Sequence, residues 1–108
     1  MTVLLDISYI GTAYAGWQVQ PNAPTVQAAM CAAVERLLGV RCPVTGCSRT
    51  DSGVHARSFC CTVSELPEGF SIPTNRLPLA LSSNLPEDIA VRRATVVPDG
   101  FHPRNDCL

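Results

Sequence analysis

The sequence predicts an α+β fold whose elements follow the order strand, helix, strand, strand, helix, strand. Hydrophobic and mostly polar residues alternate over residues 2–9, which is the pattern of a strand with one buried face. Over residues 26–38 the hydrophobic residues recur every three or four positions, which is the pattern of an amphipathic helix. Both patterns return further along the chain, with no internal repeat of the sequence, so further strands and a second helix are expected in one domain.

The first strand, residues 2–9, is predicted to bury Val3, Leu5, Ile7 and Tyr9 on one face. A loop rich in Gly, Pro and Asn follows over residues 11–24.

The first helix is the clearest element. Its apolar positions are Val26, Ala29, Met30, Ala33, Val34, Leu37 and Leu38. Thr25 is a suitable N-cap because its hydroxyl can accept a backbone N–H, and Gly39 is a suitable C′ residue because it tolerates positive φ. The helix is therefore expected to run from residue 26 to residue 38.

Two strands are predicted next, over residues 41–48 and 58–64. The link between them is short and contains Gly53, which suits antiparallel neighbours. Phe59, Cys61 and Val63 should share the buried face of the later strand.

After a loop over residues 67–73, a weaker helix is expected over residues 74–85, with Pro78 tolerated only near its start. The last strand is predicted over residues 89–97, with Ile89, Val91 and Val97 on one face.

This β-α-β-β-α-β order is the ferredoxin-like pattern. Two helices should cover one face of an antiparallel sheet and leave the other face free. The 108 residues are enough for one such domain, residues 1–108, with one hydrophobic core.

Composition narrows the function classes. The chain is 46% hydrophobic and 16% charged, and it contains no uninterrupted apolar stretch long enough to span a membrane. The first residues lack a basic segment, so no signal peptide is expected and a cytoplasmic location is predicted.

The net charge of −1 counts against tight nucleic-acid binding. All eight basic residues are Arg, however, and Arg binds phosphate bidentately. The six cysteines show no C-x-x-C or zinc-site spacing and are expected to be reduced thiols.

Residues 46–56 (GCSRTDSGVHA) carry the most chemistry. In an extended segment Arg49 and Asp51 point to the same side, which places a cation beside an acid. Such a neighbour keeps a carboxylate ionised and able to act as nucleophile or base. Thr-Asp-Ser-Gly is also ordinary turn composition, so the segment alone leaves both interpretations open.

Four segments together resemble the N-terminal half of the TruA-type tRNA pseudouridine synthases. They are residues 9–20 (YIGTAYAGWQVQ), 25–27 (TVQ), 49–56 (RTDSGVHA) and 101–104 (FHPR). The third is specific, and the other three are supporting. The chain departs from the usual pattern at Ile10, where an Asp is common, and at Ser48 and Pro103.

The resemblance implies isomerisation of uridine to pseudouridine in the tRNA anticodon stem-loop. It implies that Asp51 is the catalytic residue and that Arg49 engages RNA and turns the target nucleotide out of the stack. It also implies a homodimer in the full-length form, with no metal and no organic cofactor. The second half of such enzymes completes the cleft and supplies a Tyr and a further Arg. This chain is therefore interpreted as an N-terminal fragment that is inactive alone.

Six further residues have RNA contact as one of two possibilities, and His55, Arg57, Trp17 and Arg104 are the predicted site residues among them. His55 could contact RNA or bond to backbone. Trp17 could stack on a base or cover the edge of the sheet. Arg57 and Arg104 could bind phosphate or lie solvated on the surface, and Arg92 and Arg93 share these two possibilities.

The reaction breaks the C1′–N1 bond of uridine and forms a C1′–C5 bond. A single carboxylate can attack C1′, attack C6 of the base, or remove the C2′ proton, and the sequence leaves these routes open.

Two other function classes compete with this interpretation. A stand-alone ferredoxin-like RNA-binding module without catalysis usually carries stacking aromatics on its third strand, where this chain has Phe59, Cys60 and Cys61. A metallochaperone should show closely spaced Cys pairs, which are missing.

Overall fold

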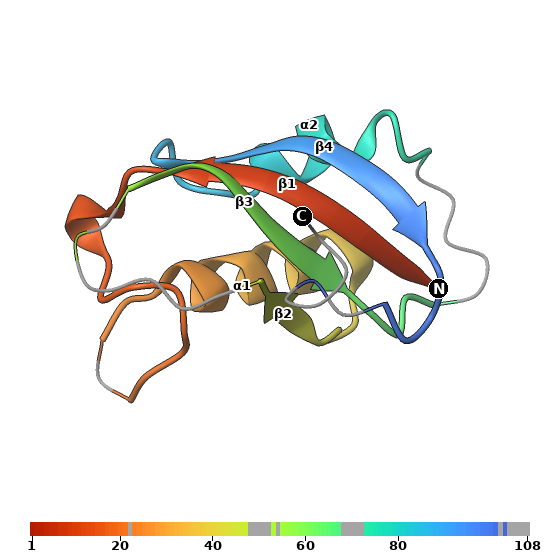
Figure 1. The fold of residues 1–108 in the computed structure, drawn as a ribbon, viewed down its shortest axis with the longest axis horizontal. Helices are drawn as coiled ribbons and strands as arrows, with labels where there is room; N and C mark the ends of the chain where they lie inside the picture. The colour runs from red at the N-terminus through yellow and green to blue at the C-terminus, as the bar shows by residue number, and fades with distance from the viewer. Residues whose placement is uncertain (22, 48–52, 54, 68–72, 102, 104–108) are drawn as a thin grey trace.

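The structure, a computed structural model, describes residues 1–21, 23–47, 53, 55–67, 73–101 and 103. Four antiparallel strands form one sheet in the order β2-β3-β1-β4. The helices α1 and α2 pack on one face of this sheet, and a short 3₁₀ helix, η1, follows β1 (Figure 1). The elements are β1 (Thr2–Tyr9), η1 (Gly11–Ala13), α1 (Val26–Leu38), β2 (Val44–Gly46), β3 (Ala56–Val63), α2 (Leu77–Ser82) and β4 (Ile89–Val97). The predicted ferredoxin-like α+β fold is confirmed.

The core lies between the sheet and the helices. Along β1 the buried side chains alternate with half-buried ones, as predicted for residues 3 to 9. They pack against the inward faces of both helices, which contribute Val26, Met30, Val34, Leu77 and Leu81. Burial of this apolar surface is the main stabilising contribution to the fold. Within the part of the chain that the structure describes, no helix has the length and hydrophobicity needed to cross a lipid bilayer.

Helix α1 begins and ends where the sequence predicted. The Thr25 hydroxyl accepts the N–H of Ala28 at 3.3 Å. The carbonyl oxygens of Gly16 and Trp17 accept the N–H groups of Val26 and Gln27, so the preceding loop satisfies donors that a helix start leaves open. At the other end Gly39 has φ +76°, the left-handed conformation of a C′ glycine.

Two elements are shorter than predicted. The second strand was expected over residues 41–48, but β2 spans three residues, Val44–Gly46. On its N-terminal side Pro43 has no N–H to donate to the sheet. The Pro43 carbonyl still accepts the N–H of Ser64, and Cys47 donates to the Cys60 carbonyl, so single hydrogen bonds continue beyond both ends of β2.

The second helix was expected over residues 74–85, but α2 has six residues. Pro78 lies in its first turn, where a missing N–H is tolerated. Turns replace helix on both sides of α2. The N–H of Arg76 donates to the Pro73 carbonyl, and the N–H of Asn84 donates to the Leu81 carbonyl.

Strand β3, in contrast, is longer than predicted at its start. It begins at Ala56, two residues before the predicted residue 58, since Ala56 pairs with Tyr9.

The predicted face of Val97 is wrong. Ile89 and Val91 are buried on the core face, but the register of β4 shifts after Val91. Beyond that bulge Val96 lies opposite Val3, and Val97 lies opposite Thr2 on the other face of the sheet. A bulge inserts one extra residue and so reverses the alternation that the sequence pattern assumed.

The Cys61 thiol should resist alkylation in the native chain. Its side chain is fully buried, and burial raises the pKa of the thiol, with a further rise from the neighbouring thiols and Asp6. A raised pKa means that less reactive thiolate is present at a given pH, and burial also blocks the reagent. With iodoacetamide at pH 8, we expect Cys61 to react at least about tenfold more slowly than half-buried Cys47.

Tandem mass spectrometry can follow this reaction residue by residue. In urea the two cysteines should react at similar rates, which is the control for sequence effects. Labelling of Cys61 in the native chain at its unfolded rate would contradict its placement in the core.

Candidate functional site

The two residues with the strongest chemical prediction, Arg49 and Asp51, lie outside the described residues, and so does Arg104. The position of their segment is nevertheless bounded. Cys47 precedes it, bonded through its N–H to the Cys60 carbonyl, and His55 follows it directly before β3. The site is therefore built from the described residues that flank residues 48–52.

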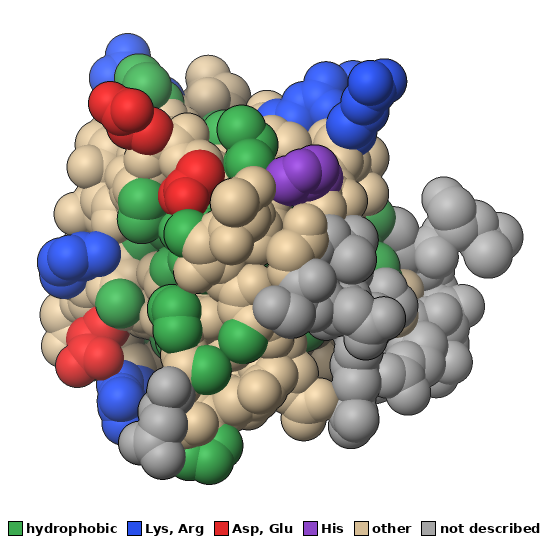
Figure 2. All heavy atoms as spheres, turned by 90° about the vertical axis from the view of Figure 1, so that its left-hand side faces the viewer, with side chains coloured by type: hydrophobic (Ala, Val, Ile, Leu, Met, Phe, Trp, Pro, Cys, Tyr) green, Lys and Arg blue, Asp and Glu red, His purple; other side chains and the backbone are tan. Residues whose placement is uncertain are grey.

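A hollow of about 660 Å³ opens at the end of the sheet where β1 ends and where β3 and β4 begin. It is lined by residues 8–10, 55–57 and 87–88, together with Ala90 and Arg92. Figure 2 faces this end of the molecule and shows a histidine beside a group of basic side chains. Because residues 55 and 56 belong to the segment RTDSGVHA, this hollow adjoins the predicted catalytic segment.

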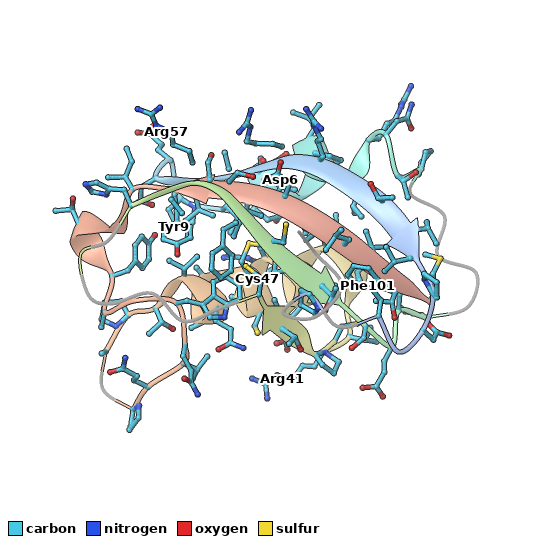
Figure 3. All side chains as sticks on the ribbon, in the orientation of Figure 1. Asp6, Tyr9, Arg41, Cys47, Arg57 and Phe101 are labelled. Carbon is cyan, nitrogen blue, oxygen red and sulfur yellow. The ribbon has the colours of Figure 1, made fainter. Side chains whose placement is uncertain are left out.

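Arginine side chains dominate one wall of the hollow. Arg92 donates from Nη1 to the carbonyl of Arg57 at 3.0 Å, which ties β4 to the start of β3. Figure 3 shows Arg57 extending away from the sheet on the side opposite Tyr9. Both arginines are exposed, and neither forms an ion pair with a carboxylate among the described residues. Exposed guanidinium groups without a carboxylate partner can bind phosphate.

The hollow also contains acids, so its charge is mixed. Glu87 is exposed, whereas Asp88 is half-buried and accepts a hydrogen bond from the Tyr14 hydroxyl at 2.7 Å. Burial, followed by the hydrogen bond and the charge of Asp88, raises the pKa of Tyr14 to about 12. Tyr14 therefore stays protonated as a donor at any ordinary assay pH. No local sequence pattern pairs Tyr14 with Asp88, since they are 74 positions apart in the chain.

His55 forms the backbone hydrogen bond that the sequence left as one of two possibilities. Its Nδ1 accepts the N–H of Gly11 at 2.8 Å. In the neutral ring the proton then resides on Nε2, which makes this nitrogen a hydrogen-bond donor. The bond ties the residue before β3 to η1, and His55 also lines the hollow.

Trp17 covers the sheet, which is the other possibility the sequence left open for it. Only 3% of its surface is exposed, and its ring lies 4.6 Å from the Phe59 ring. The indole also lies directly over Gly46, where a Cβ would come within 2.5 Å of Nε1. Stacking of Trp17 on a base would require the ring to leave this core position.

Within the described part of the chain, no group of three or more His, Cys, Asp or Glu residues could hold a metal ion. The cysteines described, which exclude Cys107, carry free thiols.

Several curated relatives of this chain carry the same name. Residues 7–106 match the family described as tRNA pseudouridine synthase. A tRNA pseudouridine synthase A from Citrifermentans bemidjiense is 46% identical over 104 residues, and one from a Geobacter species is 46% identical over 106 residues. These alignments cover 96% and 98% of this chain but 40% and 42% of the relatives. A third relative of the same name, from Clostridium kluyveri, is 45% identical over 94% of the chain. The chain thus spans about two fifths of the length of these curated relatives, and it belongs to the tRNA pseudouridine synthase family.

Proposed function

We propose that residues 1–108 form the N-terminal half of the catalytic domain of a tRNA pseudouridine synthase, an isomerase that converts uridine to pseudouridine in the anticodon stem-loop of tRNA. The match over residues 7–106, which includes the segment RTDSGVHA, carries this proposal. The hollow beside His55 and Arg57 supports it, because it provides space and cationic groups next to that segment.

In the proposed reaction the uridine is first turned out of its stack, at a cost of a few kcal/mol. Arg49 is proposed to fill the gap that the nucleotide leaves. The Asp51 carboxylate then acts on C1′, on C6 or on the C2′ proton. The C1′–N1 bond breaks, and the detached base is rotated and rejoined to C1′ through C5. The C5 proton is lost to solvent and N1 takes up a proton, so the atoms balance without an oxidant, metal or organic cofactor.

The surrounding residues have supporting roles in this proposal. Arg57, which lines the hollow, is proposed to bind a phosphate. His55 is proposed to donate from Nε2 to the RNA while its Nδ1 accepts the Gly11 N–H. Trp17 supports the sheet beneath these residues. Arg104 is proposed as a further phosphate contact. Ile10 is 57% exposed at the rim of the hollow and offers an apolar surface there.

The assembly and location are part of the same proposal. Because the chain spans about 40% of the relatives' length, other residues are expected to complete the cleft. The complete gene product is proposed to be a cytoplasmic homodimer whose tRNA site is shared between subunits. Light scattering coupled to gel filtration would distinguish a dimer from a monomer.

A tritium-release assay tests the activity. We expect the complete gene product to release tritium from an anticodon stem-loop RNA that contains [5-³H]uridine, because formation of the C1′–C5 bond expels the C5 hydrogen. The same RNA labelled only on cytidine is the control and should release none. The isolated 108-residue chain should also release none, since its cleft lacks a wall.

Two results would overturn parts of this proposal. RNA binding by the complete gene product without tritium release would favour the RNA-binding module without catalysis. Product formation by the isolated chain would show that the cleft is complete without further residues.

A further inference from the structure

The short segment from Ile10 to Tyr14 is bonded to the described residues at the end of the catalytic segment. Gly53 donates its N–H to the Tyr14 carbonyl at 3.1 Å. Gly11 donates its N–H to His55 Nδ1 at 2.8 Å. Gly53 and His55 follow Asp51 by two and four residues. Displacement of this segment would therefore be transmitted to the backbone close to Asp51.

Asp88 holds both ends of the same segment. Its carboxylate accepts the Tyr14 hydroxyl at 2.7 Å, and its backbone carbonyl accepts the N–H of Ile10 at 2.9 Å. The residue itself is fixed because it directly precedes β4, where Ile89 is buried and donates to the Pro86 carbonyl at 3.2 Å. The sheet thus supplies a rigid support for the segment.

Tyr14 is well suited to transmit this support. Only 8% of its surface is exposed, so the ring is packed on the core and cannot swing freely. Its N–H donates to the Gly11 carbonyl at 3.0 Å, which closes the turn between the two residues that contact the catalytic segment. The hydroxyl, the carbonyl and the N–H of Tyr14 therefore link Asp88, Gly53 and Gly11 in one network.

We propose that Tyr14 and Asp88 are positioning residues that fix the catalytic segment through the Tyr14 carbonyl and the Gly11 amide. This inference rests on the proposed function and extends it to residues outside the segment RTDSGVHA. A carboxylate that acts on one bond must be held to within about 0.5 Å, and a displacement of 1 Å can lower a rate by about 10². The Tyr14–Asp88 pair supplies such a constraint through the backbone of the segment from Ile10 to Tyr14.

Kinetics of the complete gene product test the proposal. We expect Tyr14→Phe, which keeps the ring and removes the hydroxyl, to lower kcat by about 10- to 100-fold with little change in KM for the RNA. Asp88→Ala should lower kcat similarly. Asp88→Asn keeps an acceptor oxygen for Tyr14 and should recover most of the activity. The double variant Tyr14→Phe/Asp88→Ala should be no worse than the single variants, because both break the same bond.

A matched control removes a hydrogen bond of the same kind elsewhere. Thr2 donates from its hydroxyl to Asp99 at 3.0 Å, beyond the far end of β4. Thr2→Val should leave kcat unchanged. A kcat of Tyr14→Phe that equals the wild-type value, or losses that add in the double variant, would overturn the proposal.

Amide hydrogen exchange separates this proposal from the proposed function. In Tyr14→Phe the N–H of Gly53 should exchange about tenfold faster, while amides in the middle of β1 keep their wild-type rates. This measurement needs no substrate, so it reports on the network even if the complete gene product forms no pseudouridine. Unchanged exchange at Gly53 would show that the Tyr14 hydroxyl does not hold the segment.

Discussion

Asp51→Asn is expected to abolish pseudouridine formation by the complete gene product, with a fall in the rate of more than about 10³-fold. The amide has nearly the shape of the carboxylate but cannot act as nucleophile or base. RNA binding should be at least as tight, because one negative charge near the phosphates is removed. Tritium release measures the first effect, and a filter-binding titration of the same RNA measures the second.

The control for this variant is the same chemical change at a distant acid. Asp99 follows β4 at the end away from the hollow, and its side chain is exposed. Asp99→Asn should keep full activity. Normal turnover by Asp51→Asn would exclude that carboxylate from the mechanism, whereas loss of RNA binding together with activity would indicate that the substitution disturbs the fold.

The elements that the sequence predicted well are those fixed by local interactions. The bounds of β1 and α1 follow from alternation, from the Thr25 hydroxyl and from the positive φ of Gly39. The bulge in β4 depends on how the strand pairs with β1, which a single-strand pattern does not contain. The late start of β2 is consistent with one missing donor at Pro43 within an otherwise suitable run.

The candidate site likewise contains features that a local sequence pattern reveals and features that depend on the three-dimensional structure. The segment RTDSGVHA stands out in the sequence because an acid and a cation lie at the spacing of one strand face. The Tyr14–Asp88 bond joins residues 74 positions apart, so no local pattern could reveal it. Tyr14 lies in the loop region after β1, where the sequence around it carries no sign of a role in the site. Its role depends on which backbone groups it reaches in three dimensions.

Trp17 lies in the loop before α1 and stabilises the sheet by packing against it. We expect Trp17→Ala to lower the free energy of unfolding by about 3–5 kcal/mol, because a large buried ring is lost and its contacts with Phe59 and Gly46 leave a cavity. Since domains of this size are stable by about 5–15 kcal/mol, the change is a large fraction of the total. Urea denaturation followed by circular dichroism measures it, because the variant lacks the chain's one Trp.

Gly46→Ala tests the same packing from the opposite side. A Cβ at Gly46 would lie 2.5 Å from Trp17 Nε1 and 3.0 Å from Phe59 Cε1, so the buried rings must move. We expect a loss of about 1–3 kcal/mol in the free energy of unfolding, which the emission of Trp17 during urea denaturation can follow. The double variant Gly46→Ala/Trp17→Phe should be more stable than the sum of the single effects predicts, because the smaller Phe ring makes room for the methyl group. If the losses in the free energy of unfolding were strictly additive, the indole of Trp17 would not lie against Gly46. Trp17 would then stabilise β2 and β3 through some other contact.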